Sequence, residues 1–267
     1  MKKPKVSVVM SVYNGMPYVK QAVESILNQT YKNFEFIIVD DASTDKSWEY
    51  LRSLRDKRVK LIKNKKNLGL AASLNIALRQ AQGDFVARMD ADDISLPIRL
   101  EDQVNFLNIN KTIDVCGTFA KLIDEKNNII GKLKYSTSPQ QIKKVLILKN
   151  PIIHPTLMAR KTFFQKLNGY QSDYDGAEDY ELLMRGSRSS NYANLPRELH
   201  LLRLSPSRRS TRSMSKMDKL DLKIKINFLK ENGPSLINLY AIFKKLFFIY
   251  LIPTYLKIKI AKFLKKA

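Results

Sequence analysis

The chain has 267 residues, 44% of them hydrophobic, which suits one sizeable α/β domain with an appendage and excludes global disorder. Its formal net charge of +22 predicts a polyanionic partner, and charge alone does not choose among nucleic acid, an anionic membrane surface and phosphorylated substrates. The single cysteine, Cys116, excludes a disulfide framework or a cysteine-based metal site and favours a reducing cytoplasm.

The first residues lead directly into a strand-like segment without an extended apolar core, so we expect no secretory signal. No apolar stretch reaches the roughly 20 residues that a membrane-spanning helix needs. Pro253 interrupts the nearest candidate, residues 246–256. We therefore predict a chain that folds from its first residues and has no spanning helix.

Strands and helices alternate along the N-terminal part. Short apolar runs rich in β-branched residues predict strands buried on both faces, at residues 6–10, 36–39, 59–62 and 85–89. Helical spacing of apolar residues predicts helices at 18–27, 48–54 and 70–81. This order is typical of a mainly parallel, doubly wound α/β sheet, in which ligands bind beyond the carboxyl ends of the strands.

The pattern changes after Pro97. It predicts helices at 99–107, 161–167 and 178–188, a strand at 115–123 with a turn at Asn127 and Asn128, and a closing strand at 199–204. From Ser205 onward the sequence is rich in Ser, Arg and Lys, and it then becomes helical, basic and apolar. We find no internal repeat.

The fourth predicted strand ends in Asp90-Ala91-Asp92-Asp93, which crowds three carboxylates together. Like charges at this spacing repel each other unless a cation binds between them. Oxygen ligands suit Mg²⁺ or Mn²⁺, and a divalent cation neutralises the growing charge of a diphosphate leaving group. The sequence therefore predicts a metal site here, and the simpler alternative is a solvated turn.

Two other acidic pairs have two interpretations each. Asp41 follows the second strand after Asp40, either as part of a capped turn or as an acceptor for a uracil or ribose edge while Tyr13 stacks on the base. Glu178 and Asp179 begin a predicted helix, where carboxylates often interact only with the helix dipole. The alternative for the second pair is a catalytic role.

Five motifs in order resemble those of family 2 glycosyltransferases: Ser7-Val8-Val9-Met10-Ser11-Val12-Tyr13-Asn14, Val39-Asp40-Asp41-Ala42-Ser43, Asn67-Leu68-Gly69-Leu70-Ala71, Met89-Asp90-Ala91-Asp92-Asp93 and Glu178-Asp179-Tyr180-Glu181-Leu182. The resemblance implies a Rossmann-like GT-A fold. It implies a catalytic domain at 1–205, divided into a nucleotide-sugar-binding half, 1–97, and an acceptor-facing half, 98–205. We assign 206–267 to a basic loop and an amphipathic helical tail.

The resemblance also implies roles on the donor side. Ser11 and Tyr13 would frame the base, and Asp41 would contact uracil or ribose. Asp90 and Asp92 would bind Mn²⁺ or Mg²⁺, and Asp90 would also contact the nucleotide, whereas Asp93 would support their loop.

On the acceptor side, Asp179 would be the general base and Glu178 would orient the base or the acceptor. Direct displacement with one base inverts the anomeric centre. His154 lies in a segment that resembles the acceptor lining, and it is either a core histidine or an acceptor contact, not the base.

One departure from the family concerns its Arg-x-His triplet after the last strand, because this chain has Arg203-Leu204-Ser205. The contact that the histidine makes is therefore in doubt. Arg203 would still meet the diphosphate, because guanidinium groups bind phosphate bidentately. A basic loop with Arg208, Arg209 and Arg212 would close over it, and the alternative is an ordinary basic linker.

The tail from Ser235 mixes apolar and aromatic residues with lysines, which suits a helix lying in an anionic lipid interface. The alternative is that its apolar face packs on the catalytic domain. The interfacial interpretation predicts a peripheral enzyme in the cytoplasm, on the cytoplasmic face of the inner membrane.

Together these features predict an inverting, metal-dependent glycosyltransferase that moves a UDP-hexose or UDP-N-acetylhexosamine sugar to a lipid-diphosphate-linked saccharide. The resemblance places this reaction in bacterial surface polysaccharide assembly, such as lipopolysaccharide O-antigen, capsule or exopolysaccharide. A sugar-1-phosphate nucleotidylyltransferase is the second enzyme candidate, but Asn14-Gly15-Met16-Pro17 is not the basic glycine-rich loop that it needs. A nucleic-acid-binding protein is the third, and we expect no nucleic acid because an acidic crevice would repel a phosphate backbone.

Overall fold

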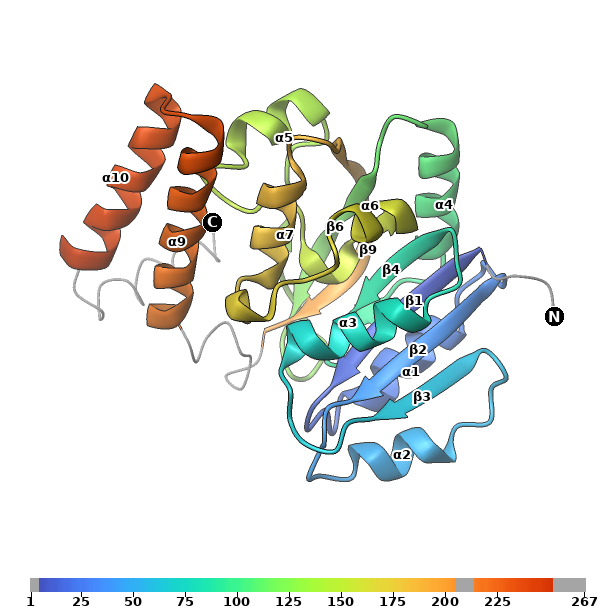
Figure 1. Ribbon diagram of the computed structural model, residues 1–267. Coiled ribbons are helices and arrows are strands. Elements are labelled where there is room, and N and C mark those ends of the chain that lie inside the picture. Colours follow the sequence, from blue (N-terminus) through green and yellow to red (C-terminus); the bar gives the residue numbers. More distant parts are fainter. Residues whose placement is uncertain (1–4, 205–213, 252–267) are drawn as a thin grey trace.

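A computed structural model describes residues 5–204 and 214–251 of the chain. Four parallel strands form the sheet of the N-terminal half (Figure 1). The strands are β1 (Val6–Val12), β2 (Phe34–Asp40), β3 (Val59–Lys63) and β4 (Phe85–Met89), and they pair in the order β3-β2-β1-β4. The helices that connect them are α1 (Val19–Leu27), α2 (Ser47–Ser53) and α3 (Leu70–Gln80). The predicted alternation and parallel sheet are confirmed.

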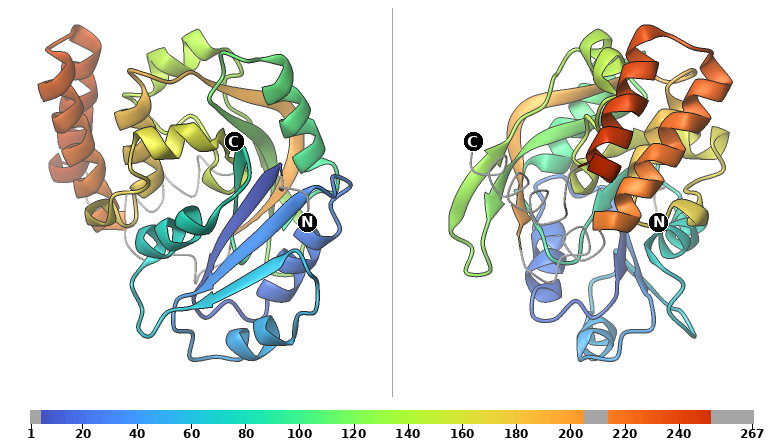
Figure 2. Two further views of the ribbon diagram at one scale, coloured as in Figure 1. Left: turned by 45° about the vertical axis from the view of Figure 1, so that its right-hand side comes forward. Right: turned by 90° about the vertical axis from the view of Figure 1, so that its left-hand side faces the viewer.

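Two hydrophobic layers cover this sheet, because its strands are apolar on both faces. Every residue of β2 is buried, as expected of a strand enclosed on both sides. Ile37 and Val39 face a layer that contains α3, whereas Phe36 and Ile38 face a layer that contains α1 and α2. The carboxyl ends of β2, β1 and β4 therefore lie side by side at one edge of the sheet (Figure 2).

The second half extends the sheet in the order β4-β8-β6-β9-β5, with β7 paired to β6. Its strands are β5 (Ile94–Ser95), β6 (Val115–Ile123), β7 (Ile129–Leu133), β8 (Met158–Arg160) and β9 (Tyr192–Arg203). Its helices are α4 (Arg99–Ile109), α5 (Pro139–Val145), α6 (Lys161–Lys166) and α7 (Glu178–Gly186), with short 3-10 turns η1 (His154–Thr156) and η2 (Ser172–Tyr174).

The structure corrects several sequence-based boundaries in this half. The closing strand β9 begins at Tyr192 instead of 199, and α7 ends at Gly186 instead of 188. The early part of β9 was missed because Pro196 and Arg197 bulge out: Thr118 pairs with Leu195, but the next residue of β6 pairs with Glu198. The elements β5, β7, β8 and α5 were not predicted.

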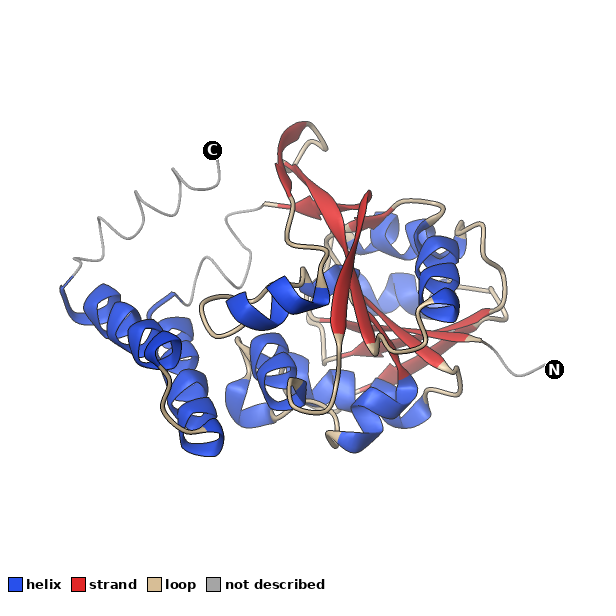
Figure 3. Ribbon diagram, turned by 90° about the horizontal axis from the view of Figure 1, so that it is seen from above, coloured by secondary structure: helices blue, strands red, loops and turns tan. Residues whose placement is uncertain are grey.

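Two long helices, α9 (Met214–Asn232) and α10 (Leu236–Leu251), form a hairpin beyond the sheet. α9 lies beside α7, and α10 lies on the outer side of α9 (Figures 1 and 3). Lys245 of α10 joins the two helices through ion pairs with Asp218 at 2.8 Å and Asp221 at 2.6 Å. Within the described residues, no helix has both the length and the hydropathy needed to span a bilayer.

Candidate active site

The predicted base-binding residues lie at the carboxyl ends of β1 and β2. Ser11 is partly buried, and Tyr13 leaves 51% of its surface exposed, so its ring is accessible to a ligand. Asp41 is buried, and its Oδ1 accepts hydrogen bonds from Asn64 Nδ2 at 2.7 Å and the Leu68 backbone N–H at 2.8 Å, while Oδ2 accepts from the Gly69 N–H at 2.9 Å. Asp41 therefore holds the loop that leads into α3, and its contact with a base stays a prediction.

The loops after β1 and β2 are bonded to each other beside Tyr13. The Asn14 N–H donates to Ser43 Oγ at 3.0 Å, and Asn14 Oδ1 accepts from the Thr44 N–H at 2.8 Å. The Gly15 N–H donates to Ser47 Oγ at 2.9 Å. These bonds fix the backbone that presents the Tyr13 ring.

Asp40 is a buried neighbour that the sequence analysis did not select. Its side chain is fully buried at the end of β2, and its Oδ1 has no hydrogen-bond partner in the described part of the chain. A buried carboxylate oxygen without a donor costs free energy. Asp40 is therefore a second acidic group to consider on the donor side.

The predicted metal carboxylates come together. Oxygens of Asp90, Asp92 and Asp93 lie within 4.8 Å of one another. Asp93 is fully buried, and its Oδ1 accepts from the Arg203 backbone N–H at 2.8 Å while its Oδ2 meets His200 Nε2 at 2.9 Å. Asp93 thus anchors the loop to β9, and Asp90 and Asp92 are the partly exposed members. Carboxylate oxygens at this spacing fit a hard divalent cation such as Mg²⁺ or Mn²⁺.

Arg203, the predicted diphosphate contact, is buried at the end of β9. Its guanidinium donates to the Asp92 carbonyl at 2.8 Å, the Asp124 carbonyl at 2.9 Å and Gln21 Oε1 at 3.0 Å, and it lies 4.3 Å from the centre of the Tyr18 ring. These contacts clamp the carboxylate loop to the rest of the domain, so a direct contact with diphosphate stays a prediction. Ser205 lies outside the described residues, as do the three arginines of the proposed basic closure, Arg208, Arg209 and Arg212.

A second group of ligand-type atoms lies at the start of α7. Atoms of His154, Glu178 and Asp179 are within 4.8 Å of one another. Asp179 Oδ2 accepts a hydrogen bond from Asn150 Nδ2 at 2.7 Å. Burial raises the pKa of the Asp179 carboxyl, as a general base requires if it is to take a proton near neutral pH. Glu178 is buried, and its Oε2 accepts from the Gly176 N–H at 2.5 Å.

His154 meets the Tyr170 hydroxyl through Nε2 at 3.0 Å. Burial, and then the charge of Arg88, lowers the pKa of His154 well below 6.5, so the imidazole is neutral at physiological pH. Tyr170 is in turn bonded to α3, because its N–H donates to Asn75 Oδ1 at 2.8 Å and its carbonyl accepts from Asn75 Nδ2 at 2.7 Å. His154 therefore lines the site as an uncharged side chain in a fixed position.

The segment before Glu178 joins three parts of the molecule. Asp175 Oδ1 accepts from the Ala71 N–H in the first turn of α3 at 3.1 Å. Tyr174 accepts a hydrogen bond at its hydroxyl from Asn227 Nδ2 of α9 at 2.8 Å. The loop that precedes the acidic pair is thus held by the nucleotide half on one side and by the C-terminal hairpin on the other.

Arg88 and His200 are two buried residues at this site whose roles the sequence analysis did not identify. Arg88, the last but one residue of β4, forms an ion pair with Asp90 Oδ1. His200 bonds Asp93 from a strand 107 residues later in the chain. The only local signal for Arg88 is a charged residue inside an otherwise apolar strand, and His200 has no comparable signal.

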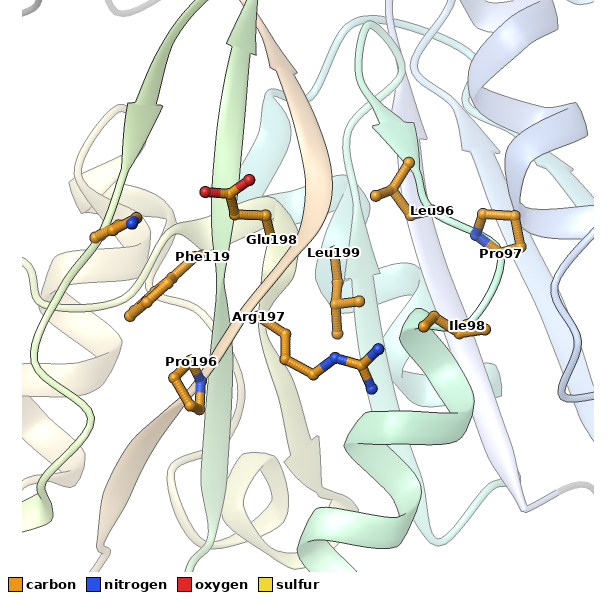
Figure 4. Close-up of a pocket in the computed structure, with 9 residues that line it drawn as sticks. Leu96, Pro97, Ile98, Phe119, Pro196, Arg197, Glu198 and Leu199 are labelled. Carbon is orange, nitrogen blue, oxygen red and sulfur yellow. The ribbon is translucent and has the colours of Figure 1, made fainter.

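A separate hollow of about 520 Å³ lies along β9 and the start of α4 (Figure 4). Its lining includes Leu96, Phe119, Pro196, Arg197 and Glu198, and it shares no residue with either acidic group. Because neither acidic group contributes to its lining, we assign the candidate active site to the two carboxylate groups and not to this hollow.

The sequence is similar to those of known proteins. Residues 7–167 match the model of the family described as glycosyl transferase family 2. An uncharacterized glycosyltransferase of Methanocaldococcus jannaschii is 37% identical over 225 residues, which are 82% of this chain and 77% of that protein. The O-antigen biosynthesis glycosyltransferase WbnJ of Escherichia coli is 38% identical over 186 residues, 67% of this chain and 70% of that protein.

Solved structures share the fold at low sequence identity. The crystal structure of S. aureus TarS 1–349 in complex with UDP-GlcNAc has a TM-score of 0.73 and 20% identity, covering 92% of this chain and 73% of that one. The mannosyltransferase PcManGT from Pyrobaculum calidifontis, in complex with GDP-Man and Mn²⁺, has a TM-score of 0.64 and 21% identity, covering 94% and 71%. The chain spans 44% of a longer S. aureus TarS chain.

Proposed function

Since this chain belongs to glycosyltransferase family 2, we propose that it is an inverting, metal-dependent enzyme that moves one sugar from a nucleotide donor to an acceptor hydroxyl. The observation that carries the proposal is the pair of acidic groups at the active-site edge of the sheet. Asp90 and Asp92 form one group with Asp93, and Asp179 forms the other with Glu178 and His154. One group suits a metal diphosphate and the other a proton acceptor.

The donor is a UDP-hexose or a UDP-N-acetylhexosamine in this proposal. Support comes from the accessible Tyr13 ring, which can stack on a base, and from the adjacent Ser11, Asp40 and Asp41. Asp41 and Asp40 are acceptors for the N–H and hydroxyl donors of uracil and ribose. The structural neighbour TarS has been crystallised with UDP-GlcNAc, which agrees with this donor class.

Asp90 and Asp92 would hold Mn²⁺ or Mg²⁺, which supplies charge neutralisation to the departing diphosphate. Asp93 keeps the loop in place through His200 and the Arg203 backbone. Arg203 supports the same loop through the Asp92 carbonyl. The neighbour PcManGT is in complex with GDP-Man and Mn²⁺, which agrees with the use of a divalent metal.

Asp179 acts as the general base in the proposed reaction. Its carboxylate takes the proton of the acceptor hydroxyl, and the acceptor oxygen forms a bond to the anomeric carbon as the bond from that carbon to the diphosphate breaks. The nucleoside diphosphate leaves with the electron pair. Asn150 orients Asp179 through its 2.7 Å hydrogen bond, and Glu178 orients the acceptor or the loop at Gly176. One displacement inverts the centre, so an α-linked donor gives a β-glycoside.

The acceptor in this proposal is a saccharide linked to a lipid diphosphate, and α10 carries the enzyme to an anionic membrane. Five apolar and aromatic residues recur at helical spacing along α10, and each exposes between 48% and 89% of its surface. They are Leu236, Tyr240, Phe243, Phe247 and Tyr250. Residues 233–267 contain lysines but no Asp or Glu, which favours an anionic lipid surface. The enzyme would then work at the cytoplasmic face of the inner membrane.

A surface-polysaccharide role follows from this acceptor class. The relative WbnJ is named for O-antigen biosynthesis, and lipopolysaccharide O-antigen, capsule or exopolysaccharide assembly would use the same reaction. The alternative, packing of α10 on the catalytic domain, accounts for the buried Ala241 but not for the exposed aromatic residues of the same helix.

The direct test is a donor screen scored by release of the nucleoside diphosphate. Purified full-length protein is incubated with UDP-glucose, UDP-galactose, UDP-GlcNAc and UDP-GalNAc, with lipid-diphosphate-linked acceptors, and with Mn²⁺, Mg²⁺ or a chelator. We expect turnover with one UDP-sugar that the chelator abolishes, and a β-linked product by NMR. A retained anomeric configuration, or equal turnover in excess chelator, would contradict the mechanism.

A further inference from the structure

Arg88 occupies an unusual position for a charged residue. It lies on β4, the central strand of the sheet between β1 and β8, and only 2% of its side chain is exposed. Its backbone N–H donates to the Leu157 carbonyl at 2.8 Å, and its own carbonyl accepts from Arg99 Nη1 at 3.1 Å. Its guanidinium forms an ion pair with Asp90 Oδ1, so one oxygen of this predicted metal ligand is committed to Arg88.

Stability alone does not explain this arginine. A second buried arginine, Arg99, lies close by, and burial together with the charge of Arg88 lowers the pKa of Arg99 to about 10. Arg88 Nε and Arg99 Nε have no hydrogen-bond partners among the described residues. Two buried guanidinium groups with unused donors are costly, and apolar residues of similar volume would often be at least as stable. A role in the site accounts for that cost.

The charge of Arg88 also reaches the second acidic group. The positive charge of Arg88 opposes the effect of burial on the pKa of Asp179 and favours its ionised form. The two groups together contain five carboxylates: Asp90, Asp92, Asp93, Glu178 and Asp179. Without a buried cation between them, mutual repulsion would favour their protonation.

We propose that Arg88 is a positioning residue that couples the two acidic groups, holding Asp90 through its ion pair and balancing the charge of Asp179 and Glu178. This inference rests on the proposed function. It assigns to Arg88 two effects on the reaction. The first is on donor binding, because Asp90 is held in one orientation. The second is on proton transfer, because Asp179 stays ionised at a lower pH than its burial would otherwise allow.

The surroundings of Asp179 define how the second effect is measured. Besides Arg88, the titratable groups that act on Asp179 or lie beside it are Asp90, Tyr135, His154, Tyr170 and Glu178. The pKa of His154 is lowered well below 6.5 and the pKa values of the two tyrosines are raised, so none of these three changes charge near neutral pH. Loss of the Arg88 charge would therefore move the acid limb of the pH profile of kcat/KM to higher pH.

The test compares Arg88→Gln, Arg88→Lys and the control Arg160→Gln in the full-length protein. Arg160 is a partly buried arginine of the neighbouring strand β8, and the described hydrogen bonds of its guanidinium go only to the carbonyls of Leu107, Asn110 and Ile113. Thermal melting first verifies that each variant is folded. The pH profile of kcat/KM, the donor KM, and calorimetric binding of UDP with Mn²⁺ are then measured.

We expect Arg88→Gln to shift the acid limb upward by about one pH unit, as removal of a nearby opposite charge does. It should also raise the donor KM and weaken UDP binding several-fold. Arg88→Lys should restore the acid limb but only part of the donor affinity, because lysine keeps the charge and loses the planar fork. Arg160→Gln should change none of these quantities.

The inference is wrong if folded Arg88→Gln keeps the wild-type acid limb and UDP affinity, or if Arg88→Lys shifts the limb as far as Arg88→Gln. If Arg88→Gln does not fold, Arg88→Lys decides, since a shifted limb in that variant would contradict a charge-based role. If the wild-type protein turns over no donor, the proposed function fails. The binding experiment still tests Arg88 in that case, because weaker UDP binding than in Arg160→Gln supports it and equal binding overturns it.

Discussion

The imidazole of His200 meets the carboxylate of Asp93 at 2.9 Å, and both side chains are fully buried. The contact joins β9 to the loop that carries Asp90 and Asp92, and Asp93 accepts a further bond from the Arg203 N–H at 2.8 Å. The predicted metal loop is therefore fixed from the far end of the domain. Its geometry depends on a strand that lies more than half of the catalytic domain away in sequence.

His200→Phe should destabilise the fold without emptying the space that the imidazole fills. Asp93 Oδ2 would lose a buried partner, which costs about 1–3 kcal/mol of the free energy of unfolding, and more if the carboxylate stays charged. Urea denaturation of His200→Phe, Asp93→Asn and the double variant measures the coupling of the pair. Additive losses in the double variant would show that the two side chains do not stabilise each other.

The part of the fold that could be predicted from sequence is the part buried on both faces. β1, β2 and β4 are continuous apolar runs because helices cover both sides of the sheet, and such runs are visible without any tertiary information. β5 and β8 are two and three residues long, too short to show a period. α5 was missed because Ile142 is its one buried residue, so it has no apolar stripe.

The site was predictable where its residues are adjacent in the chain. Asp90 and Asp92 share one turn, so their proximity follows from the sequence, and Glu178 and Asp179 open one helix. The pairing of His200 with Asp93 and of Asn150 with Asp179 depends on the course of β9 and of the segment before η1. No local pattern specifies such contacts, because only the assembled sheet brings these segments together.

Asp179→Asn should lower kcat by about 10²–10⁴-fold, which is the contribution of a positioned general base. The amide keeps the size of the side chain but takes no proton from the acceptor. UDP binding with Mn²⁺ should stay near the wild-type value, because Asp179 belongs to the group that contains His154 and not to the one that contains Asp90. Single-turnover kinetics and calorimetry measure the two quantities, and a matching loss of UDP affinity would refute the assignment.

Asp92→Ala should weaken UDP binding itself, and only in the presence of metal. In excess chelator the wild-type and variant affinities should converge, since the lost carboxylate then has no ion to bind. The comparison of titrations with Mn²⁺ and with chelator isolates the metal-dependent part. An Asp92→Ala protein that binds UDP and Mn²⁺ as well as the wild type would remove Asp92 from the proposed metal site.

Because of His154, we expect the free energy of unfolding to decrease in mild acid. Burial keeps its pKa well below 6.5 in the folded state, so the unfolded chain takes up a proton first as the pH falls through 6.5. The free energy of unfolding should therefore decrease below that pH, by at most about 1.4 kcal/mol per pH unit for one proton. His154→Gln should flatten this decrease in urea denaturation. Tyr170→Phe is the control, because it keeps the buried imidazole, and equal slopes in wild type and His154→Gln would contradict the interpretation.

Membrane binding by α10 can be separated from the structural role of the C-terminal hairpin. α9 contacts α7 and bonds Tyr174 through Asn227, so a truncation inside α9 would disturb the active-site helix as well as the membrane face. The double variant Phe243→Glu and Phe247→Glu changes only outward positions of α10, which are 67% and 48% exposed. We expect this double variant to stay in the supernatant when anionic vesicles are sedimented. The two new negative charges replace aromatic contacts and repel the lipid headgroups.

The matched control for this variant is Ile129→Glu with Ile130→Glu, since these β7 residues are similarly exposed, at 58% and 49%, and lie outside the hairpin. The control should sediment with vesicles as the wild type does, and high salt should weaken binding of both by screening the lysines. Equal release of the two double variants would show a nonspecific response to added negative charge. Full retention of the α10 variant at low salt would mean that another surface of the chain meets the membrane.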